Sequence, residues 1–253
     1  MTAWQNQPII RVRKGRYLFT FFINISAGVG GKCSMEGKRL TSYAMEELEC
    51  PKCGHKHSLK KYKVINVTEK AKLKEEIMKN RLYQFSCEEC EYMAPLTYDS
   101  LYVDSQRNIM IYMTPVMNAE FKAEIAELER EKGIDKRLVD NINDLKEKIM
   151  IVDNHLDDRV IEIIKIMYLD QIKKEMEDDT LLNILFDYNR DNYCFLVFFQ
   201  KKGIGKIPLT REFYRQVEDK YKEAIKEHST DGFMKIDMEW AGKILFKNHN
   251  KFN

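Results

Sequence analysis

Two cysteine pairs with matching spacing constrain this chain more than any other feature. Residues 50–53 read Cys-Pro-Lys-Cys and residues 87–90 read Cys-Glu-Glu-Cys. Two such pairs in one short stretch supply four thiolates, which suits a single tetrahedral Zn²⁺. Catalytic zinc sites keep one coordination position for water or substrate, and four cysteines leave none. The pattern therefore predicts a structural zinc site, and we predict no catalytic residues; the metal ligands are Cys50, Cys53, Cys87 and Cys90.

Other roles for these residues are less well supported. A thiol redox relay remains an alternative, but no βαβ pattern of the thioredoxin kind surrounds either pair. His55 or His57 could replace one thiolate as a ligand, although four sulfurs already complete the site. Cys194 sits in an apolar run that is typical of a buried strand, and Cys33 lies far upstream of the first pair. We therefore expect neither Cys33 nor Cys194 to bind the metal.

Length and charge indicate a globular protein with two domains. The chain has 253 residues, 44% of them hydrophobic, which is enough for two domains of roughly 100 to 130 residues each. It carries 42 basic and 40 acidic residues. A balance this close to neutral argues against a protein that mainly binds a phosphate backbone.

The N-terminal segment is unusual in composition. Residues 1–34 hold five basic residues and no acidic one, and residues 17–29 are mostly apolar. This run imitates a signal peptide but is too short for a membrane-spanning helix, which needs about 20 apolar residues. Reduced zinc-binding thiolates favour the cytoplasm over an oxidising compartment. Residues 1–44 are thus interpreted as an over-extended start, an added strand or tail, or a cleaved leader, and we expect no membrane span.

A small insertion must fit between the two cysteine pairs, because 33 residues separate Cys53 from Cys87. Residues 58–67 are rich in β-branched and aromatic side chains and predict a strand, and Thr68 is a candidate N-cap for a helix over residues 69–79. Residues 81–86 alternate as a second strand. A hairpin is expected next, with strands over residues 98–104 and 108–114, which completes a β-rich zinc-ribbon-like domain over residues 45–115.

The two cysteine turns are unequal. Pro51 stiffens the first turn and Gly54 tolerates positive φ, whereas Glu91 occupies the position equivalent to Gly54 in the second. Four thiolates around Zn²⁺ carry a net charge of −2, which nearby lysines can offset. The same lysines, with the two histidines, could instead form a nucleic-acid patch, against which the acidic second turn argues. The lysines concerned are Lys52, Lys56, Lys60, Lys61 and Lys63.

From residue 116 the pattern predicts an α+β domain that extends to residue 253. Helical periodicity covers residues 117–132, 135–152 and 157–177, and two or three of these helices are expected to pack as a hairpin over a sheet. Three short strands follow, joined by polar or Gly-rich turns. Thr210 is expected to cap a helix reaching about residue 227, and Asp237 to cap a final one. The predicted strands span residues 181–188, 193–200 and 206–209.

One group of ionisable residues in this half was considered as a catalytic site. It lies between two predicted helices, where perturbed pKa values sometimes mark active sites. N-capping and local ion pairing account for it better, and the GIGK sequence at residues 203–206 lacks P-loop spacing. No other catalytic motif occurs. The residues concerned are His155, Asp157, Asp158, Arg159 and Glu162.

The order of these motifs resembles the CpXC-domain family, which is named for its paired cysteine motif. The resemblance is carried by CPKCG at residues 50–54, FSCEEC at 85–90, LYVD at 101–104 and IMIYM at 109–113. It implies that the four cysteines are the family's paired motif, although Glu88 stands in place of the proline of the family name. The family has no assigned biochemical activity.

The sequence thus predicts a zinc-stabilised binding protein that recognises a protein or nucleic-acid partner in the cytoplasm. An enzyme with a pocket between the two domains, and a thiol redox protein, remain alternatives.

Overall fold

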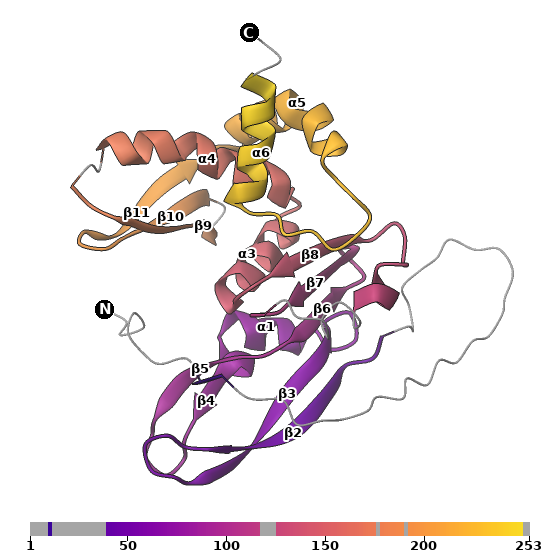
Figure 1. Ribbon diagram of the computed structural model, residues 1–253, viewed down its shortest axis with the longest axis vertical. Coiled ribbons are helices and arrows are strands. Elements are labelled where there is room, and N and C mark those ends of the chain that lie inside the picture. Colours follow the sequence, from indigo (N-terminus) through magenta and orange to yellow (C-terminus); the bar gives the residue numbers. More distant parts are fainter. Residues whose placement is uncertain (1–9, 12–38, 117–124, 176–177, 190–191, 250–253) are drawn as a thin grey trace, which may run out of the picture. The chain divides into compact units, whose positions relative to one another are not determined.

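The computed structural model describes residues 10–11, 39–116, 125–175, 178–189 and 192–249 (Figure 1). The chain divides into two compact units, residues 1–106 and residues 107–253, which are described separately. Together they give an α+β structure with both parallel and antiparallel strand pairs. The expectations for residues 1–9 and 12–38, and for the first part of the helix predicted over 117–132, lie outside the described residues. No helix in the described ranges is long and apolar enough to cross a membrane.

The first unit is built on two hairpins and one short helix. Strand β2 pairs antiparallel with β3, and β3 continues into a parallel pair with β6. Strands β4 and β5 form the second hairpin, and β1 runs parallel to β5. The elements are β1 Ile10–Arg11, β2 Ser42–Glu49, β3 Lys56–Asn66, α1 Lys72–Met78, η1 Arg81–Tyr83, β4 Gln84–Ser86, β5 Met93–Thr97 and β6 Ser100–Asp104.

Strand β2 begins at Ser42, within residues 1–44, for which an added strand was one of three interpretations; no strand was predicted over residues 45–49. Its pairing with β3 is specified by cross-strand contacts: Tyr43 lies opposite Tyr62, and their ring centroids are 5.8 Å apart. The buried Lys61 forms a 2.5 Å ion pair with Glu46. Such cross-strand pairs are the contacts that stabilise a hairpin of this kind.

The predicted helix over residues 69–79 is shorter than expected. Helix α1 begins at Lys72, and its N-cap residue makes no side-chain cap. The predicted cap Thr68 instead accepts a hydrogen bond from the backbone N–H of Ser105 at 2.8 Å. Asn66 closes the turn before the helix, because its Oδ1 accepts from the backbone N–H groups of Thr68 and Glu69. The strand predicted over 81–86 likewise begins as a 3-10 turn and is extended only from Gln84.

The second unit places helices against a three-stranded antiparallel sheet in the order β11-β10-β9, and it also contains the parallel pair β7 and β8. In Figure 1, α4 runs along this sheet, and the inward side chains of β9 and β10 are buried with those of α4, α5 and α6. Phe195 and Ile164 are fully buried there. The elements are β7 Ile109–Met113, β8 Asp135–Val139, α3 Ile142–Asp153, α4 Asp158–Glu175, β9 Leu181–Asn189, β10 Asn192–Phe199, β11 Gly203–Leu209, α5 Arg211–Glu227 and α6 Met238–His249.

The helix predicted over residues 135–152 is wrong in its first third. Residues 135–139 form β8, which pairs in parallel with β7. The helix starts only after Asn141, whose side chain accepts from the N–H groups of Asn143 and Asp144. Burial of Leu138 and Val139 in a sheet therefore outweighs the helical periodicity of the segment.

The remaining predicted elements are found close to their expected bounds, except that β11 begins at Gly203 instead of residue 206 and so includes part of the predicted Gly-rich turn. Thr210 caps α5, since Oγ1 accepts from the Phe213 N–H at 3.1 Å. Asp237 accepts from the Trp240 N–H at 2.9 Å and so caps α6. Both caps follow the preference for short polar side chains at helix N-termini.

Candidate metal centre

The tips of the two hairpins of the first unit carry the four cysteines. The first turn joins β2 to β3 and the second joins β4 to β5. In the first, the Cys50 N–H donates to the His55 carbonyl at 2.8 Å and the Gly54 N–H donates to the Cys50 carbonyl at 2.8 Å. The second repeats the pattern, with Cys87 N–H to the Tyr92 carbonyl at 2.8 Å and Glu91 N–H to the Cys87 carbonyl at 3.0 Å. The same backbone turn therefore occurs twice.

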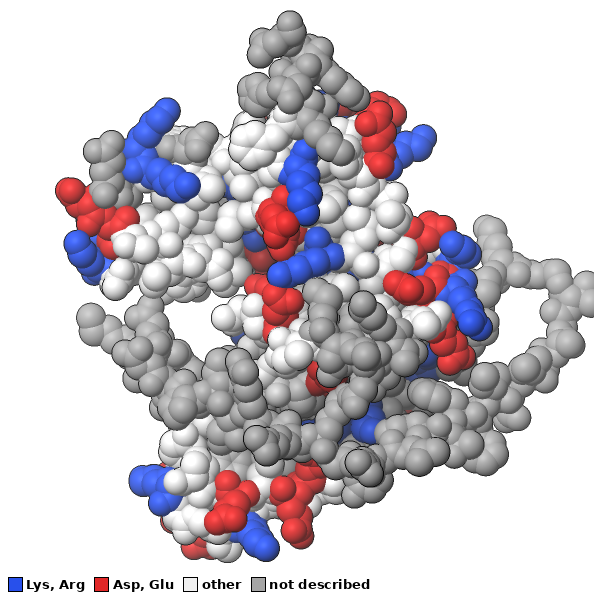
Figure 2. All heavy atoms as spheres, viewed as in Figure 1, with Lys and Arg blue, Asp and Glu red and all other residues white. Residues whose placement is uncertain are grey.

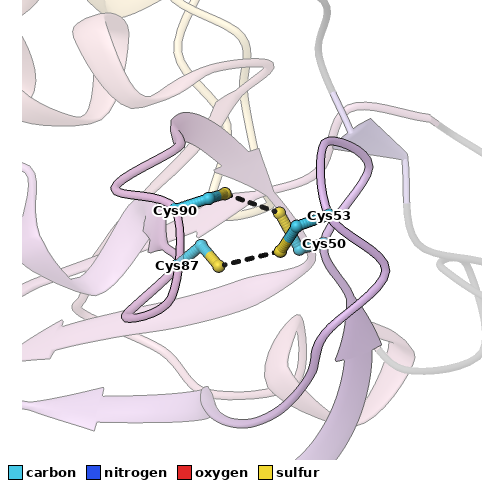
Figure 3. A group of neighbouring side chains, drawn as sticks. All are labelled: Cys50, Cys53, Cys87 and Cys90. Carbon is cyan, nitrogen blue, oxygen red and sulfur yellow. Dashed lines mark hydrogen bonds between the residues drawn. The ribbon is translucent and has the colours of Figure 1, made fainter.

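The four sulfurs converge between these turns (Figure 3). Cys50 Sγ lies 3.6 Å from Cys90 Sγ, and Cys53 Sγ lies 3.6 Å from Cys87 Sγ. All four lie within 4.8 Å of one another. A tetrahedral zinc with Zn–S bonds of about 2.3 Å requires sulfurs about 3.8 Å apart. The spacing of the sulfurs therefore fits one tetrahedral ion, and all four cysteines predicted as ligands are brought together.

Within each turn, the two cysteines differ in burial. Cys50 and Cys87 are 2% and 1% exposed, whereas Cys53 is exposed and Cys90 is half-buried. One cysteine of each pair thus faces the protein interior and the other faces solvent. An ion would be anchored to the core by Cys50 and Cys87 while remaining reachable from the side of Cys53.

The thiols perturb one another strongly. Burial tends to raise the pKa of Cys50, yet the backbone N–H groups of Cys53 and Lys52 and the neighbouring thiols lower that pKa to about 7. The backbone N–H of His55 tends to lower the pKa of Cys53, but burial and the other three sulfurs raise it to about 12. Burial also raises the pKa of Cys90. The thiols of Cys53 and Cys90 therefore resist ionisation, and a bound cation is what would stabilise the full set of thiolates.

His57 contacts the site without being one of the four converging residues. Its Nε2 lies 3.2 Å from Cys87 Sγ, and its ring packs edge-on against Phe85 with centroids 5.4 Å apart. With a proton on Nε2, the imidazole donates to the sulfur and reduces the negative charge of the cluster. His57 is therefore a hydrogen-bonding neighbour of the site.

Only some of the lysines expected beside the metal lie near the sulfurs. Lys52 donates to the Cys90 carbonyl at 3.4 Å and so links the two turns. Lys61 is buried and paired with Glu46, and Lys60 Nζ lies 4.3 Å from the centre of the Tyr43 ring. These two lysines stabilise the β2–β3 hairpin, and they are not among the groups in contact with the sulfurs.

Glu91 carries the conformational cost of the second turn. Its φ is +57°, and Gly54 has φ +74° at the same position of the first turn. A residue with a Cβ is disfavoured in this region by roughly 1 kcal/mol, whereas glycine is not. The sequence analysis identified this position, and the structure places a glutamate in the left-handed conformation there.

Replacing Glu91 with glycine is expected to stabilise the first unit by about 1 kcal/mol, because the strain in the left-handed backbone conformation is removed. Glu91→Ala removes the same negative charge but keeps a Cβ, so the difference between the two variants isolates the backbone effect. Urea unfolding at fixed free zinc measures both. Gly54→Ala is the mirror control and should destabilise the first unit, because alanine is strained at the φ of +74° that Gly54 adopts. The added Cβ meets Glu49 Oε1 at an ordinary contact distance of 3.5 Å, so a steric clash does not contribute. Equal stabilities for Glu91→Gly and Glu91→Ala would show that the turn is not strained.

With this geometry established, a scan against protein-family models gives a single informative result. Residues 48–165 match the model described as CpXC protein. This stretch belongs to the CpXC family. The match includes both cysteine turns and extends through β8 and α3 into α4, so the CpXC stretch ends inside the second unit. No curated protein and no solved structure was found to match the chain.

The ionisable residues considered as a catalytic group in the second unit do not form one cluster. Arg159 pairs with Asp157 at 2.7 Å, partly exposed, and His155 Nε2 lies 3.1 Å from an Arg107 guanidinium nitrogen. Asp158 and Glu162 are buried in a separate ion network. The other members of this network were missed from the sequence; they are Arg137 on β8, Glu147 and Lys148 on α3, and Lys165 on α4.

Proposed function

We propose that Cys50, Cys53, Cys87 and Cys90 hold one structural Zn²⁺ and that this ion makes the first unit a stable binding module in the cytoplasm. The convergence of four sulfurs from two hairpin tips carries the proposal. The donor set is all sulfur, which suits Zn²⁺ in a closed site. Bound zinc would supply a cross-link between segments separated by 33 residues, and it would leave no position for a substrate.

The outer face of the β2–β3 hairpin is the proposed binding surface. Tyr43 is 50% exposed and Met45 is 56% exposed on neighbouring positions of β2. Met45 lies opposite Lys60 on β3, and Lys60 covers the Tyr43 ring. Tyrosine and methionine are enriched in protein interfaces, and tyrosine supplies a large contact area at a low entropic cost.

A protein or peptide partner fits this face better than a nucleic acid. Its charges alternate in sign, since Glu49 lies opposite Lys56 across the strands. Lys61 is buried in an ion pair and adds no free charge. On the face shown in Figure 2, basic and acidic side chains are interspersed among the coloured residues. A surface of this kind lacks the continuous basic stripe that a phosphate backbone requires.

Photo-crosslinking in cells tests the proposal directly. A benzophenone amino acid in place of Tyr43 should give one or a few discrete protein adducts on a denaturing gel. The same group in place of the exposed Lys222 on α5 is the control and should give none. Adducts that disappear with nuclease would favour the nucleic-acid alternative. Failure of the Tyr43 position to give more adduct than the control would contradict a binding surface on this hairpin.

A further inference from the structure

A buried ion network occupies the space between α3 and α4 in the second unit. Its six members, three cations and three anions, are each at most 5% exposed. Arg137 binds both carboxylate oxygens of Asp158, with Nε 2.8 Å from Oδ2 and Nη2 2.9 Å from Oδ1. Lys148 reaches Glu162 at 3.1 Å, and Lys165 reaches Glu147 at 2.8 Å and Glu162 at 3.0 Å. Burial of so many charges costs more than an apolar core would, so a use beyond stability is worth seeking.

Part of the network has a clear structural use. Glu147 Oε1 accepts a hydrogen bond from the backbone N–H of Phe186 in β9, which is the end strand in the sheet order β11-β10-β9. The carboxylate thus satisfies a backbone donor on the outer edge of that strand. This contact accounts for the burial of Glu147 and for the burial of Lys165 as its ion-pair partner. It does not account for the burial of Glu162.

Four of the six charges line or adjoin a cavity of about 170 Å³. Its lining includes Glu147, Lys148, Glu162 and Lys165, together with the half-buried Asp144. Lys235, Asp237, Asn183 and several apolar side chains complete the lining. The volume corresponds to about six water molecules at about 30 Å³ each, which limits an occupant to a small molecule.

The N–H donors of the lysines in the cavity lining are already used. Lys148 uses its three N–H donors on Glu162, Asp158 and the Ile236 carbonyl, the last at 2.7 Å. Lys165 is shared between two carboxylates, and Lys235 pairs with Asp140 at 2.6 Å. All three ammonium groups are therefore already engaged by protein acceptors.

Acceptors, in contrast, remain available. Both lysine contacts of Glu162 that qualify as hydrogen bonds go to Oε1, and its Oε2 accepts none from the described residues. Asp144 accepts from Asn141 through Oδ2 only, at 2.8 Å. The lining holds four carboxylates and three ammonium groups, which leaves one negative charge in excess. Asn183 adds one neutral donor, because its Oδ1 is already used by the Ile184 N–H.

We propose that this cavity binds a small organic ammonium compound, held through N–H donation to Glu162 Oε2 and Asp144 Oδ1. A cation satisfies the excess negative charge, and N–H groups satisfy the two remaining acceptors. A hydroxyl next to the ammonium would find the Asn183 amide as its donor. The site lies wholly in the second unit and is independent of the cysteine cluster.

Ligand-observed saturation-transfer NMR on the full-length protein tests this site. Ethanolamine is the probe, and tetramethylammonium, which carries the same charge but no N–H donor, is the matched negative. The proposal expects saturable transfer to ethanolamine, at least tenfold weaker or absent for tetramethylammonium. Equal signals from the two compounds, or no saturable signal from ethanolamine, would overturn it.

Two variants assign the signal to the cavity. Asp144→Asn removes one acceptor charge from a half-buried side chain and should weaken ethanolamine binding about tenfold, since a hydrogen bond to a charged group contributes about 1.5–3 kcal/mol. Glu162→Gln should weaken it further, and if that protein fails to fold, Asp144→Asn alone decides. Asp219→Asn on the exposed face of α5 is the control and should leave binding unchanged. Unchanged affinity in Asp144→Asn would overturn the proposal.

Discussion

Cys87→Ser is expected to abolish stoichiometric zinc binding and to unfold the first unit. Cys87 is 1% exposed and belongs to the inner side of the cluster, so its loss removes both a ligand and a core contact. Structural zinc in small peptides contributes about 10–16 kcal/mol of apparent binding free energy at pH 7, and most of that is folding free energy. A unit of this size cannot replace that contribution from its remaining core.

The measurement combines zinc content with limited proteolysis. Cleavage in Cys87→Ser should concentrate in residues 39–106, while fragments of the second unit persist, because that unit has its own core. Cys194→Ser is the matched control, since Cys194 lies in β10 and outside the cluster. It should retain one zinc and wild-type protection. A Cys87→Ser protein with one bound zinc and unchanged protection would refute a structural role for the site.

Asp158→Asn is expected to destabilise the second unit by about 3–5 kcal/mol. Asp158 neutralises Arg137 and contacts Lys148 at 3.2 Å, and all three side chains are at most 5% exposed. Removal of its charge leaves the buried network with one positive charge in excess, which is far more costly than loss of a surface ion pair. Urea unfolding followed by far-UV circular dichroism gives the free energy of unfolding.

The neighbouring position supplies the control. Asp157→Asn alters an ion pair with Arg159 whose side chains are 23% and 24% exposed, so it should cost at most about 1 kcal/mol. Similar losses for the two variants would show that the buried network does not stabilise the unit.

The difference in stability between wild type and Asp158→Asn is expected to depend on pH. Burial tends to raise the pKa of Asp158, but Arg137 and Lys148 hold that pKa well below its usual range. A carboxylate with a lowered folded-state pKa stabilises the protein above its unfolded pKa of about 3.9, and this contribution is lost as the pH falls toward the folded value. The stability gap between wild type and Asp158→Asn should therefore be widest above about pH 5 and should narrow below about pH 4. A gap that stays constant across this range would contradict the ionised state of Asp158.

The metal site was predictable from sequence because its information is local. The CxxC spacing fixes each turn. The sequence also shows a glycine at position 54 and a glutamate at the equivalent position 91, where the turn requires a positive φ. Strand β2 was not predictable in the same way, because its identity depends on pairing with β3 through Tyr62 and Lys61. For residues 135–139 the sequence predicted the wrong element. The segment has helical periodicity, but its pairing with β7 makes it a strand.

The buried ion network lay beyond sequence reasoning for a further reason. In the sequence, Asp158 has the features of an ordinary residue at a helix N-terminus. The helix dipole and local ion pairing were sufficient to explain a carboxylate at that position. Its partner Arg137 is 21 residues away on a strand that had been assigned to a helix. Only the fold brings α3, α4 and β8 together and turns scattered charges into one network.

Native mass spectrometry of the untagged, full-length protein tests the central claim most directly. The account predicts a folded charge-state distribution whose mass exceeds that of the chain by one zinc less two protons, because at any given charge state one Zn²⁺ replaces two protons. Addition of acid should release one zinc and shift the distribution toward unfolded charge states. A folded protein with the mass of the bare chain, or lighter by the hydrogens lost in disulfides between these cysteines, would contradict it.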